Sequence, residues 1–212
     1  MSLKAHMTLV AVTGLLLTNT ALAHPEHEHD GLTMNFYVHQ NGAQVEALVR
    51  TPLTMFQNVG LPLHGPNYVD TTAFYEIDPH AEGDATYAER AANAVNKAFT
   101  ISFDDRELVL ETREVRVAPP HDTSFDSFET AAEKITLEAE PHQNIDQNHG
   151  YIDTLLAGEL PEPDAELSIT PLLAIYGHHL TISVHYLRNG ESVRAFHVHG
   201  DSRNTPLDEP AQ

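Results

Sequence analysis

Apolar and polar residues alternate along much of the chain, which is the pattern of half-buried β-strands. Residues 32–39 (LTMNFYVH) and 44–50 (QVEALVR) flank the turn-like QNGA and predict an opening hairpin. Further strands are predicted in AFTISFDD (98–105), ELVLETREVRVAP (107–119), KITLEAEP (134–141), AELSITPLLAIYG (165–177), HLTISVHYL (179–187) and ESVRAFHVHG (191–200). Residues 51–78, with three prolines among apolar residues, predict a loop that lies against the core.

Helical periodicity interrupts this pattern once. The residues that recur at the spacing of one helix face are Ala88, Ala91, Ala92, Val95 and Phe99. With Asp84 as a cap, this spacing predicts a helix over 84–98, and a short helix is expected over 124–132. We therefore expect a mainly β fold, an antiparallel β-sandwich with Ig-like layers and one helical insertion.

The first 23 residues have the organisation of a secretory signal peptide. Lys4 provides a positive charge, residues 7–17 are apolar, and Ala21-Leu22-Ala23 is a small-x-small cleavage site. Cleavage there places the mature N-terminus at His24 and the protein in the periplasm or outside the cell. The apolar run of about 11 residues is shorter than the roughly 18 that a spanning helix needs, so no direct membrane insertion is expected.

Three parts are expected to follow the signal peptide: a mobile tail rich in histidine and acids (24–31), a single β-sandwich domain (32–208) and a disordered C-terminal end (209–212). The formal charge of the chain is −20, which repels phosphate backbones and excludes nucleic acid as a partner. There are 15 histidines and no cysteine, so disulfides are excluded and imidazole chemistry becomes the main candidate.

Five stretches occur together in an order and near a spacing that is known from one family. They are NVGLPLHGPNYVD (58–70), DTSFDSFETA (122–131), GYIDTLL (150–156), LSITPLLAIYG (167–177) and VRAFHVHGDSRNTPLD (193–208). Most of residues 44–208 thereby resembles the extracytoplasmic N-terminal region of HupE/UreJ-type membrane proteins, a family associated with nickel or cobalt uptake. The transmembrane helices that usually follow in the family are absent from this sequence, so the resemblance implies location and metal context only.

The densest histidine pattern is HHLTISVHYLRNGESVRAFHVHG, residues 178–200. A three-residue loop of residues 188–190 would unite the apolar residues of both strands on one core face. A two-residue Asn189-Gly190 loop would instead pair residue 188 with 191 and turn one strand's apolar residues to the histidine side. We therefore expect the three-residue loop, which places His179 opposite His199.

In that register His179, His197 and His199 can supply three imidazole ligands to one metal ion, with His185 farther along the same face. Imidazole with carboxylate suits nickel, cobalt, copper or zinc, and the sequence does not select among them. The alternative is a solvated face that carries histidine without metal.

The tail histidines His24, His27 and His29 are interleaved with acids. Pro25 has no amide hydrogen, which blocks a square-planar amino-terminal copper and nickel site. The tail is then a weak metal collector, a solvated segment, or the start of a copper-binding histidine brace formed by the amine and ring of His24.

Three functions remain. The first is a periplasmic, non-enzymatic domain that binds or handles a transition-metal ion beside a membrane metal transporter. The second is a metal-free structural or protein-interaction β-sandwich. The third is a copper-dependent oxidase with a histidine brace at His24. No serine–histidine–aspartate order typical of hydrolases is present, so catalytic residues are expected only in the third case.

Overall fold

A six-stranded sheet runs through the part of the chain that the computed structural model describes, residues 32–81, 83–137, 143–163 and 165–208. All of these belong to one unit of the chain, residues 31–212. The strands in spatial order are β12 (Glu191–His199), β11 (Leu180–Arg188), β1 (Leu32–Asn41), β2 (Gln44–Pro52), β9 (Tyr151–Glu159) and β7 (Glu111–Ala118). The predicted opening hairpin is confirmed, since β1 and β2 pair antiparallel.

One pairing in this sheet departs from the antiparallel expectation. β1 lies parallel to β11, with Leu32 opposite Leu180 and Gln40 opposite Arg188. Antiparallel neighbours can be joined by a short hairpin, whereas parallel neighbours need a long crossover. Nearly the whole domain lies between these two strands in sequence, so their relative direction is set by the fold and not by a turn.

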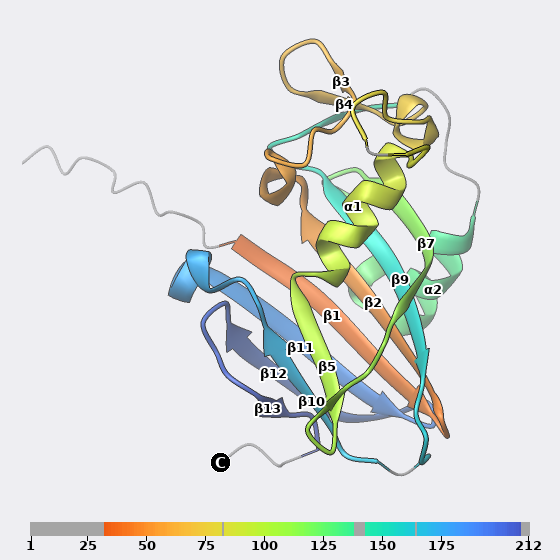
Figure 1. The fold of residues 1–212 in the computed structure, drawn as a ribbon, viewed down its shortest axis with the longest axis vertical. Helices are drawn as coiled ribbons and strands as arrows, with labels where there is room; N and C mark the ends of the chain where they lie inside the picture. Colours follow the sequence, from red (N-terminus) through yellow and green to blue (C-terminus); the bar gives the residue numbers. More distant parts are fainter. Residues whose placement is uncertain (1–31, 82, 138–142, 164, 209–212) are drawn as a thin grey trace, which may run out of the picture. The chain divides into compact units, whose positions relative to one another are not determined.

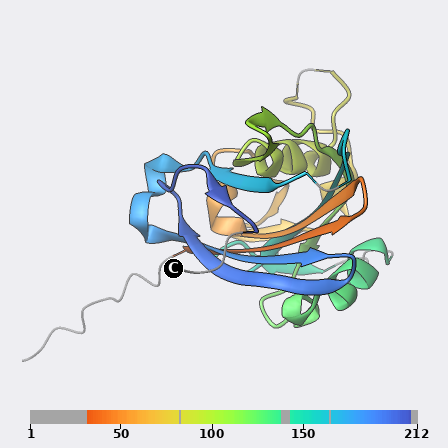
Figure 2. The same cartoon turned by 90° about the horizontal axis from the view of Figure 1, so that it is seen from below.

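A second sheet covers one face of the first (Figures 1 and 2). Its strands in order are β13 (Thr205–Pro206), β10 (Leu167–Pro171), β5 (Phe99–Phe103) and β6 (Arg106–Glu107). The rings of Phe36 in β1 and Phe99 in β5 meet edge to face, with centroids 4.7 Å apart. The mainly β, sandwich-like fold predicted from the sequence is therefore confirmed. A small third sheet joins β3 (Leu63–His64), β4 (Tyr68–Asp70) and β8 (Asn144–Asp146).

The main core lies between these layers. Alternate residues of the central strands point into it and are completely buried, and they include Met34, Phe36, Val38, Val45, Ala47, Val49, Ile182, Val184 and Tyr186. Alternation places the intervening residues on the outer face of the six-stranded sheet. The loop region 51–78 also contributes, because Leu53, Phe56 and Phe74 are buried in this core as predicted, within η1 (Leu53–Phe56) and η2 (Ala73–Tyr75).

Helix α1 (Tyr87–Asn96) packs on the same side as the second sheet (Figure 2). Its predicted apolar face is confirmed for Ala88, Ala91, Ala92 and Val95, which are all buried. The predicted cap at Asp84 is wrong. Thr86 caps the helix instead, because its hydroxyl accepts a hydrogen bond from the Glu89 N–H while the Glu89 carboxylate accepts one from the Thr86 N–H.

Helix α2 (Phe128–Thr136) lies on the opposite, outer face of the six-stranded sheet (Figure 2). It follows η3 (Ser124–Asp126) and begins after Ser127, whose hydroxyl accepts a hydrogen bond from the Thr130 N–H. The strand predicted over 134–141 is therefore wrong at its start, where Lys134 to Thr136 complete this helix. Ile135 has a buried partner one turn earlier in Ala131, so helical periodicity competes with alternation there. Residues 138–141 lie outside the described residues.

Two other sequence predictions need correction. The strand predicted over 165–177 ends at Pro171, and η4 (Ala174–His179) follows it. β9 was not predicted from alternation, although it lies between β2 and β7. Its polar residues Asp153 and Thr154 are both fully buried, so the strand lacks the polar-out pattern of a half-exposed strand.

Candidate functional site

The β11–β12 hairpin has a different register from the one predicted. Arg188 pairs with Glu191, so the turn is the two-residue Asn189-Gly190 loop that we had argued against. Both turn residues have positive φ, 52° and 81°, as a type I′ turn requires. The predicted three-residue loop is wrong.

A β-bulge reconciles this turn with the core. The pairing shifts next to Leu187, and from Tyr186 opposite Arg194 onward the strands continue with Val184 opposite Phe196. The shorter turn shifts the strand pairing by one residue, which would turn the side chains of one strand to the other face. The extra residue on β12 shifts the pairing by one more residue and so restores the facing of the side chains. The apolar residues of both strands thus share the inner face after all, and the histidines share the outer face.

The predicted cross-strand histidine pair is not formed. His199 lies opposite Thr181, and His197 lies opposite Ser183. His179 belongs to η4, before β11 begins. Among residues 32–81, 83–137, 143–163 and 165–208, no group of three or more His, Asp or Glu side chains is arranged to hold a metal ion. The specific three-histidine arrangement predicted from sequence is therefore wrong.

Three of the predicted residues still lie on one surface. His197 and His199 are exposed on the outer face of β12, and His185 is half-buried on the neighbouring β11. The His185 ring packs against Tyr37, with centroids 4.9 Å apart. Burial lowers the pKa of His185, and the charge of the nearby His197 lowers it further. We call His185, His197 and His199 the histidine face.

The tail histidines His24, His27 and His29 lie outside the described residues. Neither the metal-collecting tail nor the histidine brace at His24 is tested by the structure, and both stay predictions.

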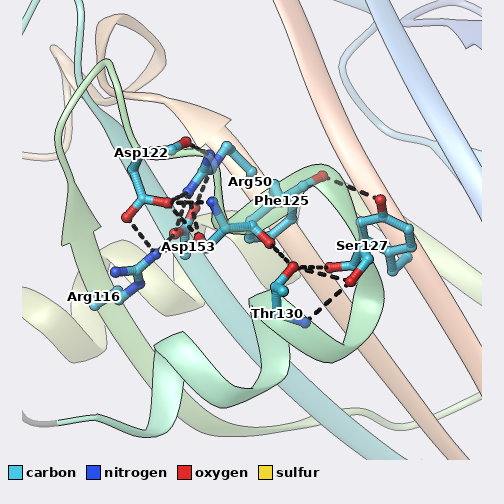
Figure 3. Close-up of polar contacts among 9 residues, drawn as sticks. Arg50, Arg116, Asp122, Phe125, Ser127, Thr130 and Asp153 are labelled. Atoms are coloured by element: carbon cyan, nitrogen blue, oxygen red, sulfur yellow. Dashed lines mark hydrogen bonds and ion pairs between the residues drawn. The ribbon is translucent and has the colours of Figure 1, made fainter.

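The same outer face carries a buried ionic cluster at its other end, which sequence reasoning missed (Figure 3). Arg50 in β2 bonds Asp153 in β9 through two parallel contacts, Nε to Oδ1 at 2.8 Å and Nη2 to Oδ2 at 2.9 Å. Arg116 in β7 bonds the same carboxylate, Nη2 to Oδ2 at 2.8 Å. Asp122 accepts from both arginines, at 3.1 Å and 3.0 Å. We call Arg50, Arg116, Asp122 and Asp153 the ionic cluster.

The cluster is almost completely removed from water. Asp153 is fully buried, and the other three side chains are between 5% and 9% exposed. Phe125 of η3 covers Arg50, whose guanidinium carbon lies 4.4 Å from the ring centroid. Such charges are tolerated only when paired, and each carboxylate here has arginine partners. One signal in the sequence could have revealed the cluster. In EVRVA the charged residue Arg116 lies within a strand whose apolar residues alternate as they do in a partly buried strand.

Electrostatics within the cluster favour the charged forms of Asp122 and Arg50. Burial would raise the pKa of Asp122, but hydrogen bonds from the Ser124 hydroxyl and N–H and from Arg50, together with the charge of Arg116, hold that pKa well below its usual range. Burial would likewise lower the pKa of Arg50, and its bonds to Asp153 and Asp122 raise it instead.

A cavity of about 240 Å³ opens beside the cluster. Its polar lining includes Arg116, His121, Asp122 and Lys134, and its apolar lining includes Val117, Pro119 and Leu137. A second, more open cavity shares His121, Asp122, Lys134 and Leu137 with it. The two cavities therefore adjoin at these residues, between the end of β7 and helix α2.

A further cavity brings His64 and His80 together with Asp70 and Asp78. Both carboxylates already have partners: Asp70 accepts hydrogen bonds from the N–H groups of Thr72 and Ala73, and Asp78 forms an ion pair with Arg90. The acids needed for a mixed metal site are thus engaged within the protein.

Within the described part of the chain, no helix is both long enough and apolar enough to cross a membrane. Comparison with known protein families and with curated proteins gives no match to this chain.

Proposed function

We propose that this protein is an extracytoplasmic, non-enzymatic domain that binds a transition-metal ion weakly through its histidine face. The observation that carries the proposal is the position of His185, His197 and His199 on one side of β11 and β12, with the last two exposed to solvent. The imidazoles of His197 and His199, with His185 beside them and water completing the shell, replace the three-histidine arrangement expected from the sequence.

Strand geometry supports such a site. His197 and His199 are two residues apart on one strand, so their side chains leave the same face about 6 to 7 Å apart at the backbone. His185 lies diagonally from His197 across the strand pair. Imidazole ligates nickel, cobalt, copper and zinc alike, so the metal in the proposal is any of these ions.

The charge state of the ligands favours binding near neutral pH. Metal ligation needs neutral imidazole. The pKa of His185 is lowered by burial and by His197, so protons compete less at His185 than at an ordinary histidine. The formal charge of −20 also concentrates cations near the protein.

A weak, water-completed site exchanges metal readily, which suits transfer to a partner. The resemblance of the sequence to the extracytoplasmic region of HupE/UreJ-type proteins supports a membrane metal transporter as that partner.

The test is metal titration of the full mature chain, by calorimetry with nickel, copper and zinc. Replacing His197 and His199 together by asparagine should weaken binding about tenfold or more, because each lost imidazole removes a direct ligand. His80→Asn removes an exposed imidazole elsewhere and is the matched control. A chain in which His24, His27 and His29 are asparagine separates the tail from the face. If the tail variant abolishes binding while the paired β12 variant leaves it intact, the histidine face is not the site.

A second candidate function is protein docking through β12. This strand ends the sheet, so one side of its backbone has no neighbouring strand in the six-stranded order. Val193 of β12 is 46% exposed, Leu172 before η4 is 54% exposed, and Ile175 within η4 is 89% exposed. An open edge with apolar residues can accept a strand from a partner. Sedimentation at increasing concentration should show self-association that Val193→Lys reduces, and a strictly monomeric parent would contradict docking of a second copy.

A further inference from the structure

We propose that the cavity between β7 and α2 binds a small organic carboxylate through Arg116 and Lys134. This inference is independent of the histidine face and uses different residues.

The first support is a buried donor without an acceptor. Arg116 is 7% exposed, and its Nη2 bonds Asp122, Ser124 and Asp153. Its Nε is buried and has no hydrogen-bond partner among the described residues. A buried N–H left without an acceptor costs free energy, and most such groups in proteins are satisfied. Arg116 lines the cavity, so a ligand bound there lies beside a guanidinium group with unused donor capacity.

The second support is the local charge. Within the ionic cluster two arginines face two aspartates, so the cluster itself is balanced. Lys134 lines the same cavity and forms no ion pair with any residue that the structure describes, while Glu133 lines the neighbouring, more open cavity. In the described lining of the first cavity Arg116 and Lys134 thus outnumber the carboxylate of Asp122, which favours an anionic ligand in a chain with 31 acidic and 11 basic residues.

The lining indicates an organic anion. Val117, Pro119 and Leu137 provide apolar surface beside the charged groups, which suits a short carbon chain better than a fully hydrated inorganic ion. A volume of about 240 Å³ corresponds to about eight water molecules at roughly 30 Å³ each. Arginine pairs with a carboxylate through planar, charge-assisted hydrogen bonds, and lysine adds a point charge. The ligand class is therefore a small carboxylate with a short apolar body.

The experiment uses the full mature chain and titrates acetate, propionate, butyrate and inorganic phosphate at constant ionic strength. Binding is followed by amide chemical shifts of residues 116–118 and 121–124 and by calorimetry. We expect saturable binding that strengthens from acetate to butyrate as the apolar lining is used. Lys134→Gln should weaken butyrate binding about tenfold, because a charge-assisted contact is lost, and Lys134→Arg should restore most of it.

Lys97 provides the matched control, since it is an exposed lysine at the end of α1, away from this cavity. Lys97→Gln makes the same change in net charge and should leave binding unchanged. Equal weakening by both glutamine variants would show a general charge effect and overturn the site. Phosphate binding as tight as butyrate binding would overturn the organic carboxylate. Absence of saturable shifts with every anion would overturn the proposal altogether. Because the histidine face is untouched in these variants, nickel binding should stay at the parent level in all of them.

Discussion

The outer face of the six-stranded sheet carries charged residues at its β2–β9–β7 end and histidines at its β11–β12 end. Both sets occupy the same alternating positions, opposite the residues that enter the main core. At the first end η3 and α2 lie over the sheet, and the charges are buried and mutually bonded. At the second end His197 and His199 are exposed.

This comparison shows what a covering helix does to a polar sheet face. Under η3 and α2 water is excluded, so every charge must find a partner and the cluster becomes part of the structure. On the open end the imidazoles of His197 and His199 stay in contact with solvent, so they need no partner within the protein. The cavity with Lys134 lies at the border of the covered end, where a charged group is half-buried and still reachable.

The largest effect is expected from breaking the covered end. Asp153→Ala leaves Arg50 and Arg116 buried without their shared carboxylate, and should lower the free energy of unfolding by about 3–5 kcal/mol. Urea unfolding at neutral pH measures it. Glu111→Ala removes one partner of an exposed ion pair with Arg113 and should change stability far less. Equal losses of unfolding free energy in the two variants would mean that burial does not decide how much an ion pair contributes to stability.

A smaller effect is expected when acid titrates the covered end. The folded-state pKa of Asp122 lies below that of an ordinary carboxyl, so the folded protein binds fewer protons than the unfolded chain. The stabilisation from Asp122 is therefore fully present above pH about 4 and is lost as pH falls below that value. Asp122→Asn should show a flatter decline of unfolding free energy across this acid range. A slope as steep as that of the parent would show that Asp122 is not the titrating group.

The smallest effect is expected from titrating the open end. The folded-state pKa of His185 is below its ordinary value, so its contribution to stability is present above pH about 6.5 and is lost as pH falls below it. His185→Gln should remove this weak dependence, whereas the surface variant His80→Gln should keep it. Unfolding measured between pH about 5 and 7 checks the difference, and ring resonances of His185 report its titration directly. A His185 resonance that titrates above pH 6.5 would contradict the effect of burial and of His197.

Several local elements could be predicted from the sequence because they depend on residues close together in the chain. Alternation placed the opening hairpin, β5, β11 and β12, and three- and four-residue spacing placed the buried face of α1. The same reasoning identified which face of β11 and β12 carries the histidines. It failed for the histidine pair itself, because a two-residue turn and a bulge produce the same facing as a three-residue loop but shift the partners along the strand.

The tertiary structure decided which distant segments meet. Arg50 and Asp153 are 103 positions apart, and only the adjacency of β2 and β9 makes them partners. The parallel pairing of β1 with β11 and the placement of η3 over the ionic cluster are likewise set by long-range packing. Alternation in the sequence determines which side chains point away from the core, because side chains along a strand change face with a period of two residues. Whether the residue then meets a helix, an opposite charge or water depends on contacts far away in the sequence, and these are chosen by the burial of the whole sheet.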